Sequence, residues 1–227
     1  VIGISLSTVF ILIYNILYFN PILGYDAEAH YAYINYLSRY LPRDFRLPTM
    51  NETREFFNPP IGYLVPSITQ VICRNVIESS DFLSDCQPYY GKVTQVFQSF
   101  MYIATIFINL VTLKSINNSN KLINVGYLIL ISLLAVNYRT ISMIRGEPYI
   151  LFFMSIFLYL IYKHEKSEFE FNFKYIFYTG LVIGAIALSR QWGFLLFLPL
   201  IFLFFSKELN IKYLKLWSLS AFFGAAF

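Results

Sequence analysis

Three ionisable side chains follow the first apolar run of the chain at a spacing that suits acid–base chemistry. Asp26, Glu28 and His30 alternate with alanines. Asp26 and His30 are four residues apart, so a helix would place them on one face. Asp26 would then lie near the N-terminus of that helix, where the helix dipole favours an ionised carboxylate. A carboxylate beside an imidazole can serve as a general base, so all three are candidate catalytic residues. The alternative is an N-cap aspartate on a surface helix with a solvated histidine.

A second polar cluster surrounds a double proline. Glu55 and Asn58 precede Pro59 and Pro60, and Tyr63 follows them. Proline is well tolerated in the first turn of a helix, so the pair predicts a fixed helix start. This start would aim Glu55 and Asn58 in a defined direction, and we take both, with Tyr63, as candidate substrate-binding residues. A stiff surface turn is the alternative.

Arginines mark two later turns between apolar runs. Arg139, Arg145 and Glu147 lie in one turn, and Arg190 lies in the other. The planar guanidinium group pairs bidentately with phosphate, which a lysine ammonium does not do. We therefore expect these four residues to bind substrate, with the arginines forming a phosphate clamp. The alternative is that the arginines anchor helices at a membrane boundary.

The composition predicts a chain that lies largely in lipid. Hydrophobic residues make up 57% and charged residues 13% of the sequence, whereas a soluble domain carries about 25% charged residues. The apolar runs predict an all-α polytopic membrane protein with about seven transmembrane helices. They cover 2–19, 93–113, 122–138, 148–162, 175–189, 191–206 and a run from 214. The chain starts without methionine and stops in an apolar run, so we expect residues 1–227 to be the N-terminal part of a transmembrane domain.

Charge distribution predicts the orientation of these helices. Residues 20–92 form a polar, proline-containing segment after the span at 1–19, for which we expect a loop with short juxtamembrane helices. If 61–77 does not cross, nearly all lysines lie on one side, which the positive-inside rule places in the cytoplasm. The polar clusters, in the loop and between the spans of 93–227, then face the non-cytoplasmic side. We therefore expect a multi-pass protein of the plasma membrane in a prokaryote or the endoplasmic reticulum in a eukaryote.

Two motifs resemble those of a known enzyme group. The pattern Asp-x-Glu-x-His-x-x-Tyr-Ile-x-Tyr-Leu starts at Asp26, and Glu-x-x-Asn-Pro-Pro-Ile-x-Tyr starts at Glu55, with a Leu-Pro pair between them. Together they resemble the first outer loop of protein O-mannosyltransferases and aminoarabinose transferases, which are membrane glycosyltransferases of the GT-C type (family 39-like). The segment from Gly180 to Pro199, which contains Arg190, is similar to a later span of the same enzymes.

The resemblance implies glycosyl transfer on the non-cytoplasmic membrane face. The donor would be a sugar carried on polyprenyl phosphate, and the acceptor a lipid, a glycan or a protein. Asp26 matches the acidic residue of the family and would be the base that activates the acceptor. Arg145 and Arg190 would hold the donor phosphate as it leaves. Ala27 separates the acidic pair that is adjacent in relatives, so neither the sugar nor the acceptor is specified.

Other functions and ligands are less well supported by the residues. A transporter or flippase segment and a non-catalytic membrane subunit are the alternatives, although transporters place functional charges near the bilayer midplane. We expect no cofactor and no metal site, because the two cysteines and two histidines are scattered. No stretch has the basic pattern of a nucleic-acid-binding protein. Cys73 and Cys86 are expected in an oxidising compartment, either as a disulfide or as two free thiols.

Overall fold

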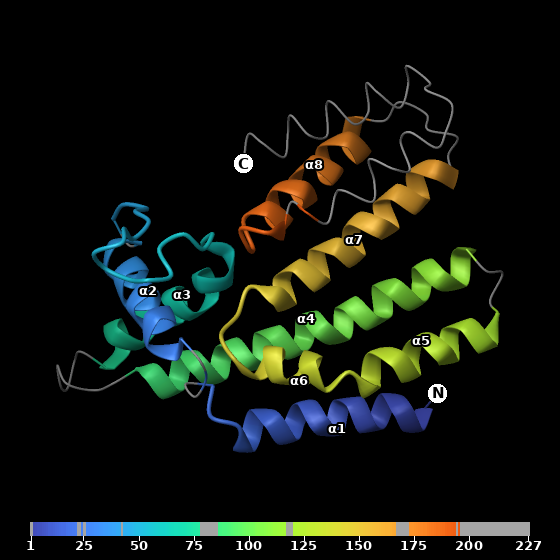
Figure 1. Ribbon diagram of the computed structural model, residues 1–227, viewed down its shortest axis with the longest axis horizontal. Coiled ribbons are helices and arrows are strands. Elements are labelled where there is room, and N and C mark those ends of the chain that lie inside the picture. Colours follow the sequence, from blue (N-terminus) through green and yellow to red (C-terminus); the bar gives the residue numbers. More distant parts are fainter. Residues whose placement is uncertain are drawn as a thin grey trace.

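All regular elements of the described chain are helices, which confirms the all-α prediction (Figure 1). The computed structural model describes residues 2–21, 24, 26–41, 43–77, 86–116, 120–166, 173–193 and 195. The helices are α1 (Ile2–Tyr18), α2 (Ala27–Tyr40), α3 (Ile61–Ile77), α4 (Gln87–Ile116), α5 (Lys121–Leu133), α6 (Ala135–Ser142), α7 (Glu147–Lys166) and α8 (Phe173–Ala187).

The longer helices lie side by side and the α2–α3 pair lies at one end of them. Figure 1 shows α1, α5, α4, α7 and α8 in succession across the molecule, with α2 and α3 next to the start of α4. The largest contacts join α4 to α7, α7 to α8, α2 to α3 and α3 to α4. The α2–α3 pair, the turn before α7 and the turn after α8 thereby lie at the same end of the molecule.

The prediction of about seven transmembrane helices is wrong. Among the described residues one helix, α4, is long and apolar enough to cross a membrane. The number of candidate spans rises to two if α5 and α6, which are bent by 54° relative to each other, are counted as one span. The runs predicted at 2–19 and 175–189 form helices of 17 and 15 residues, and a membrane helix needs about 20 apolar residues. The runs predicted at 191–206 and from 214 lie outside the described residues, except for 191–193 and 195.

The predicted multi-pass location is wrong for the same physical reason. The described ranges contain at most one or two apolar helices of sufficient length. The assignment of the lysines to the cytoplasmic side required several successive membrane spans, so it has no basis. The run predicted at 148–162 is part of α7, which has 20 residues but begins at Glu147 and ends at Lys166. Charged residues in both end turns leave its apolar stretch shorter than the helix. Of the apolar window of α4, 33% is buried inside the structure.

The α2–α3 pair has its own core. Tyr33, Ile34 and Leu37 of α2 are fully buried, and the Tyr33 ring stacks on Tyr63 of α3 with the centroids 4.0 Å apart. The sequence allowed either a disulfide or two free thiols for Cys73 and Cys86. In the structure they form a disulfide, which joins α3 to the residue before α4. The segment 61–77 is therefore a helix that packs on α2 and is held near its C-terminal end by the disulfide.

Polar side chains of α4 hold the neighbouring segments in place. Gln95 Nε2 donates to the carbonyl oxygens of Phe19, at 3.1 Å, and Ser142, at 2.7 Å. Lys92 donates to Phe19 O at 2.9 Å and also to Ile16 O at the end of α1. These carbonyls lie where a helix end leaves acceptors without backbone partners. One face of α4 thus positions both the end of α1 and the segment after α6.

Candidate functional site

Three chain segments meet at closely approaching glycines. Ile61 N donates to Leu188 O at 3.2 Å, which ties the start of α3 to the end of α8. A Cβ on Gly62 would lie 3.1 Å from the Cα of Gly146, and a Cβ on Gly146 would lie 2.2 Å from Ser189 O. Only residues without a side chain allow this approach. The double-proline segment, the start of α7 and the turn after α8 therefore share one junction.

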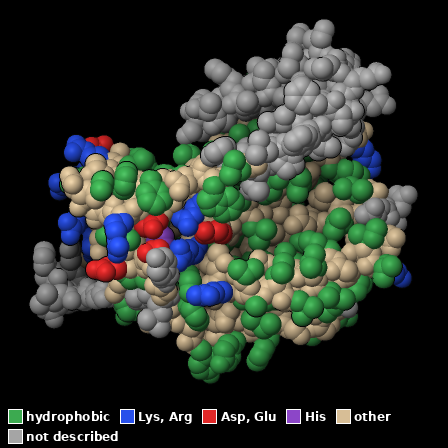
Figure 2. Space-filling view, in the orientation of Figure 1, with side chains coloured by type: hydrophobic (Ala, Val, Ile, Leu, Met, Phe, Trp, Pro, Cys, Tyr) green, Lys and Arg blue, Asp and Glu red, His purple; other side chains and the backbone are tan. Residues whose placement is uncertain are grey.

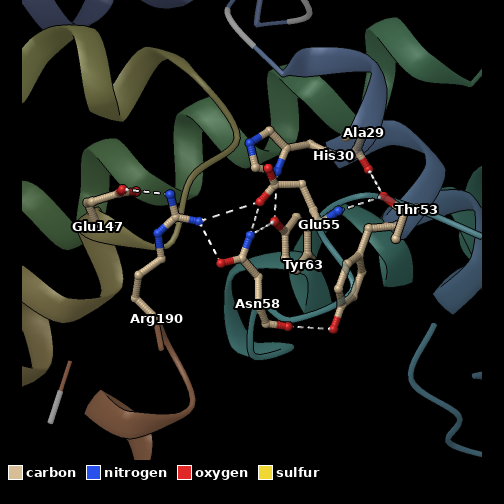
Figure 3. Close-up of polar contacts among 9 residues, drawn as sticks. Ala29, His30, Thr53, Glu55, Asn58, Tyr63, Glu147 and Arg190 are labelled. Carbon is tan, nitrogen blue, oxygen red and sulfur yellow. Dashed lines mark hydrogen bonds and ion pairs between the residues drawn. The ribbon is translucent and has the colours of Figure 1, made fainter. Parts of the chain in front are cut away.

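Arg190 joins the polar side chains of this junction (Figure 3). Its Nη1 donates to Asn58 Oδ1 at 2.9 Å and lies 3.9 Å from Glu55 Oε2. Its Nη2 lies 3.2 Å from Glu147 Oε1. The side chains of Arg190 and Glu55 are only 16% and 13% exposed. Charge pairs this far from water interact more strongly than surface pairs, and losing one partner leaves a buried charge.

A hydrogen-bonded chain runs from Arg190 to His30. Asn58 Nδ2 donates to Glu55 Oε2 and, at 3.2 Å, to the hydroxyl oxygen of Tyr63. The Tyr63 hydroxyl in turn bonds His30 Nδ1 at 2.7 Å. The Tyr63 hydroxyl stays protonated over the physiological range, because burial raises its pKa. The polar atoms of α2, α3, α7 and the turn after α8 are thus connected without interruption (Figure 3).

His30 is held as a neutral imidazole. Its side chain is buried. Burial, followed by the positive charges of Arg145 and Arg190, lowers the pKa of His30 from 6.5 to about 3. An imidazole with such a pKa is a weak base near neutral pH, because efficient bases have pKa values near the working pH. Its geometry suits it to orient Tyr63.

Asp26 lies at the N-cap of α2, which is the position that the alternative interpretation of the sequence gave it, and it has an unusual backbone conformation. Its φ and ψ are 62° and 14°, in the left-handed region, and its carboxylate makes no capping hydrogen bond. Among the described residues it is the one non-glycine residue with positive φ. Aspartate tolerates this conformation better than most residues, and such positions are enriched at functional sites. His30 N donates to Asp26 O at 3.1 Å, while the imidazole bonds Tyr63 instead.

A pocket of about 270 Å³ lies next to the junction. It is lined by α6, the first turns of α7 and Trp192, and Glu147 belongs to its wall. Figure 2 shows acidic, basic and histidine side chains together on the face where the α2–α3 pair meets the other helices. No cluster of three or more metal-binding side chains occurs among the described residues.

No family model, no curated protein and no solved structure matches the chain. The resemblance to GT-C glycosyltransferases therefore stays a prediction, and the function must be argued from the geometry of this site.

Most of the residues singled out in the sequence lie together. The connected set is His30, Glu55, Asn58, Tyr63, Glu147 and Arg190. Arg145 lies beside it, lining a small pocket with His30 and Gly24. Glu28, in the first turn of α2, and Arg139, on α6, are exposed and outside the connected set.

Two supporting residues were missed by the sequence analysis. Tyr33 donates from its hydroxyl to Asn58 O at 2.9 Å, and Thr53 donates to Ala29 O at 2.7 Å. Tyr33 follows His30 by three residues, so the helical spacing could have indicated a shared face. Thr53 gave no such signal, because its partner is a backbone carbonyl 24 residues away.

Proposed function

We propose that the protein transfers a glycosyl group from a polyprenyl-phosphate-linked sugar to an acceptor hydroxyl. The observation that carries the proposal is the junction at Arg190, where one guanidinium contacts Asn58, Glu55 and Glu147. Displacement of a phosphate leaving group requires oriented cations that stabilise its developing negative charge. The polyprenyl carrier is proposed because the sequence resembles enzymes that use polyprenyl-phosphate donors.

In the proposed reaction, the oxygen of the acceptor hydroxyl attacks C1 of the donor sugar while the Asp26 carboxylate takes the proton of that hydroxyl. The bond between C1 and the phosphate oxygen breaks, and its electron pair leaves with the polyprenyl phosphate. Asp26 suits this role because its carboxylate does not cap α2. A general base of this kind accelerates transfer by about 10²–10⁴-fold.

Arg145 and Arg190 are proposed to stabilise the negative charge that develops on the phosphate. A guanidinium has five N–H donors, and the hydrogen bond to Asn58 and the two carboxylate contacts hold the plane of Arg190 in one orientation. Such preorganisation avoids a reorganisation cost during the reaction. Glu55 and Glu147 offset the positive charge before the phosphate binds.

His30 and Tyr63 are proposed to act as positioning residues. The neutral imidazole bonds Tyr63, and Tyr63 accepts from Asn58, which bonds Arg190. Loss of His30 would therefore disturb the arginine without removing a reacting group.

The direct test offers the protein labelled mannosyl, glucosyl and aminoarabinosyl polyprenyl phosphates with extracted acceptors. We expect label on the acceptor and release of equimolar polyprenyl phosphate from one of these donors. Absence of transfer from all three, with a correctly folded protein, would favour the alternative of a non-catalytic subunit.

A further inference from the structure

The connection between α2 and α3, residues 43–57, exposes large apolar side chains although it is anchored to the fold. Pro48 and Thr53 are buried, and Thr53 donates to Ala29 O of α2 at 2.7 Å. Met50, between these two anchors, is 76% exposed. The exposed large apolar residues of this 43–57 loop are Phe45, Leu47, Met50, Phe56 and Phe57. Exposed apolar residues that lie this close together mark interaction sites more often than chance.

The cations next to these apolar side chains are all arginines. The loop and the end of α2 expose Arg39, Arg43, Arg46 and Arg54. Of the two exposed carboxylates, Asp44 pairs with Arg46, and Glu52 accepts hydrogen bonds from Thr49. No carboxylate in the described ranges lies within ion-pair distance of the other three arginines. The loop therefore has positive charge available for an external anion, and a guanidinium pairs well with phosphate.

This combination fits an anionic lipid surface better than a peptide. Peptides bind along a sheet edge or in a groove. The described part of the chain has no strand, and the two pockets near the junction are lined by other segments. A lipid surface is fluid and needs no matching groove, because apolar side chains enter among the headgroups while basic side chains pair with anionic lipids. Figure 2 shows apolar and basic side chains beside one another at the α2–α3 end of the molecule.

We propose that the 43–57 loop docks on an anionic lipid surface. The five apolar side chains enter the headgroup layer, and Arg39, Arg43 and Arg54 pair with lipid phosphates. The contact is peripheral, made by an irregular loop rather than by a spanning helix. It goes beyond the proposed function and does not depend on it.

Docking would also bring the Arg190 junction close to the lipid. Phe56 and Phe57 are exposed, whereas Glu55 and Asn58, on either side of them, turn inward and contact Arg190 (Figure 3). The segment that contacts the lipid is thus continuous with the segment that holds Arg190. A phosphate carried by a membrane lipid would lie within reach of the same junction.

A tryptophan placed in the loop reports directly on contact with lipid. The two tryptophans of the sequence are removed by Trp192→Phe and Trp217→Phe, and Met50→Trp supplies the reporter. The protein is titrated with vesicles of phosphatidylcholine, with or without an equal amount of phosphatidylglycerol, and with brominated lipid as quencher. We expect a blue shift and quenching of the fluorescence with the anionic vesicles, and much weaker binding to the neutral ones.

A second reporter controls for general adsorption of the protein. Leu122, at the start of α5, is exposed beside Lys121 and lies at the opposite end of the molecule from the α2–α3 pair (Figure 1). Leu122→Trp in the same background therefore has a similar local composition but lies outside the loop. We expect it to stay unquenched under the conditions that quench Met50→Trp.

Charge variants test the role of the arginines. Arg43→Gln combined with Arg54→Gln should weaken binding to the anionic vesicles about 20–30-fold, since each basic side chain near such a surface contributes about fivefold. Added salt should weaken it too. Lys163→Gln with Lys166→Gln, at the exposed end of α7, removes the same charge elsewhere and should leave binding unchanged. All four positions are exposed, and circular dichroism checks the fold of each variant.

Three results would overturn the inference: no response of Met50→Trp to anionic vesicles, equal quenching of both reporters, or wild-type affinity of the double arginine variant. A response to polyglutamate but not to vesicles would identify an acidic protein segment as the partner instead. The vesicles contain no glycosyl donor, so the outcomes are separable from the proposed function. Docking without glycosyl transfer keeps this surface and rejects the enzyme, and transfer without docking does the reverse.

Discussion

Arg190 donates a hydrogen bond from Nη1 to Oδ1 of Asn58 across 2.9 Å, although 132 residues separate the two in the chain. The bond links the turn after α8 to the segment that opens α3. It is accompanied by ion pairs of the same guanidinium with Glu55 and Glu147. The junction thus both stabilises the fold and forms the centre of the candidate site. Measurements of stability and of activity separate these two roles.

Replacing Arg190 should destabilise the protein. Arg190→Ala leaves Glu55 and Glu147 largely buried without their cation, and we expect the free energy of unfolding to fall by roughly 2–3 kcal/mol. Arg190→Lys should recover part of this loss, because it keeps the charge but not the planar fork. Urea unfolding measures both. Arg54→Ala, at an exposed residue, is the control. Equal stability of the Arg190 and Arg54 variants would show that the Arg190 contacts do not stabilise the fold.

His30 should give the protein a specific acid sensitivity. Its pKa is about 3 in the folded chain and 6.5 for an unperturbed histidine, so the unfolded state takes up the proton first. The free energy of unfolding should therefore fall as pH falls from 6.5 towards 3, by up to about 1.4 kcal/mol per pH unit. Above pH 6.5 this contribution is fully present. Unfolding of wild type and His30→Gln from pH 7.5 to 4 measures the difference in slope; parallel curves would contradict the buried neutral imidazole.

Gly146 should not tolerate a side chain. A Cβ there would lie 2.2 Å from Ser189 O, so Gly146→Ala must push the start of α7 away from the turn that carries Arg190. Overpacking of this kind costs about 1–3 kcal/mol or more. Gly126→Ala is a matched control, because a Cβ at Gly126 has nothing within 4 Å. Thermal unfolding should show a lower Tm for Gly146→Ala only, and a Tm equal to that of wild type would show that the junction can relax.

The disulfide should contribute measurably to stability. Cys73 and Cys86 are 13 residues apart, and closing a loop of about 15 residues stabilises the folded state by roughly 3 kcal/mol in the chain-entropy account. Reduction should lower the urea midpoint of the wild type. A Cys73→Ser and Cys86→Ser double variant should show that lower midpoint with or without reductant. Insensitivity of the wild type to reductant would argue against the bond.

The sequence predicted helix positions well and helix environment poorly. Apolar runs at 2–19 and 175–189 coincide with α1 and α8 because a long apolar run without strand-like alternation favours a helix. The run at 122–138 contains a break in the helix at Leu134, although no proline or glycine at this position indicates one. There, Tyr102 of α4 donates to Ile131 O at 2.8 Å, a tertiary contact. Such contacts are not encoded in the hydropathy of the run itself.

The grouping of the site residues was partly visible in the sequence, whereas their electrostatics were not. The double proline correctly indicated a helix start, and Asn58 and Tyr63 lie on either side of it. The neutral state of His30 depends on burial and on Arg145 and Arg190, which come from distant segments. No local pattern around His30 contains that information.

The most direct test of the central claim compares glycosyl transfer by the wild type and by Asp26→Asn, using the labelled donor that gives activity. Asp44→Asn, at an exposed residue paired with Arg46, is the control, and circular dichroism checks that each protein is folded. If Asp26 is the base, transfer by Asp26→Asn should fall by roughly 10²–10⁴-fold, with the control unaffected. Undiminished transfer by a folded Asp26→Asn protein would remove Asp26 from the mechanism and contradict the account.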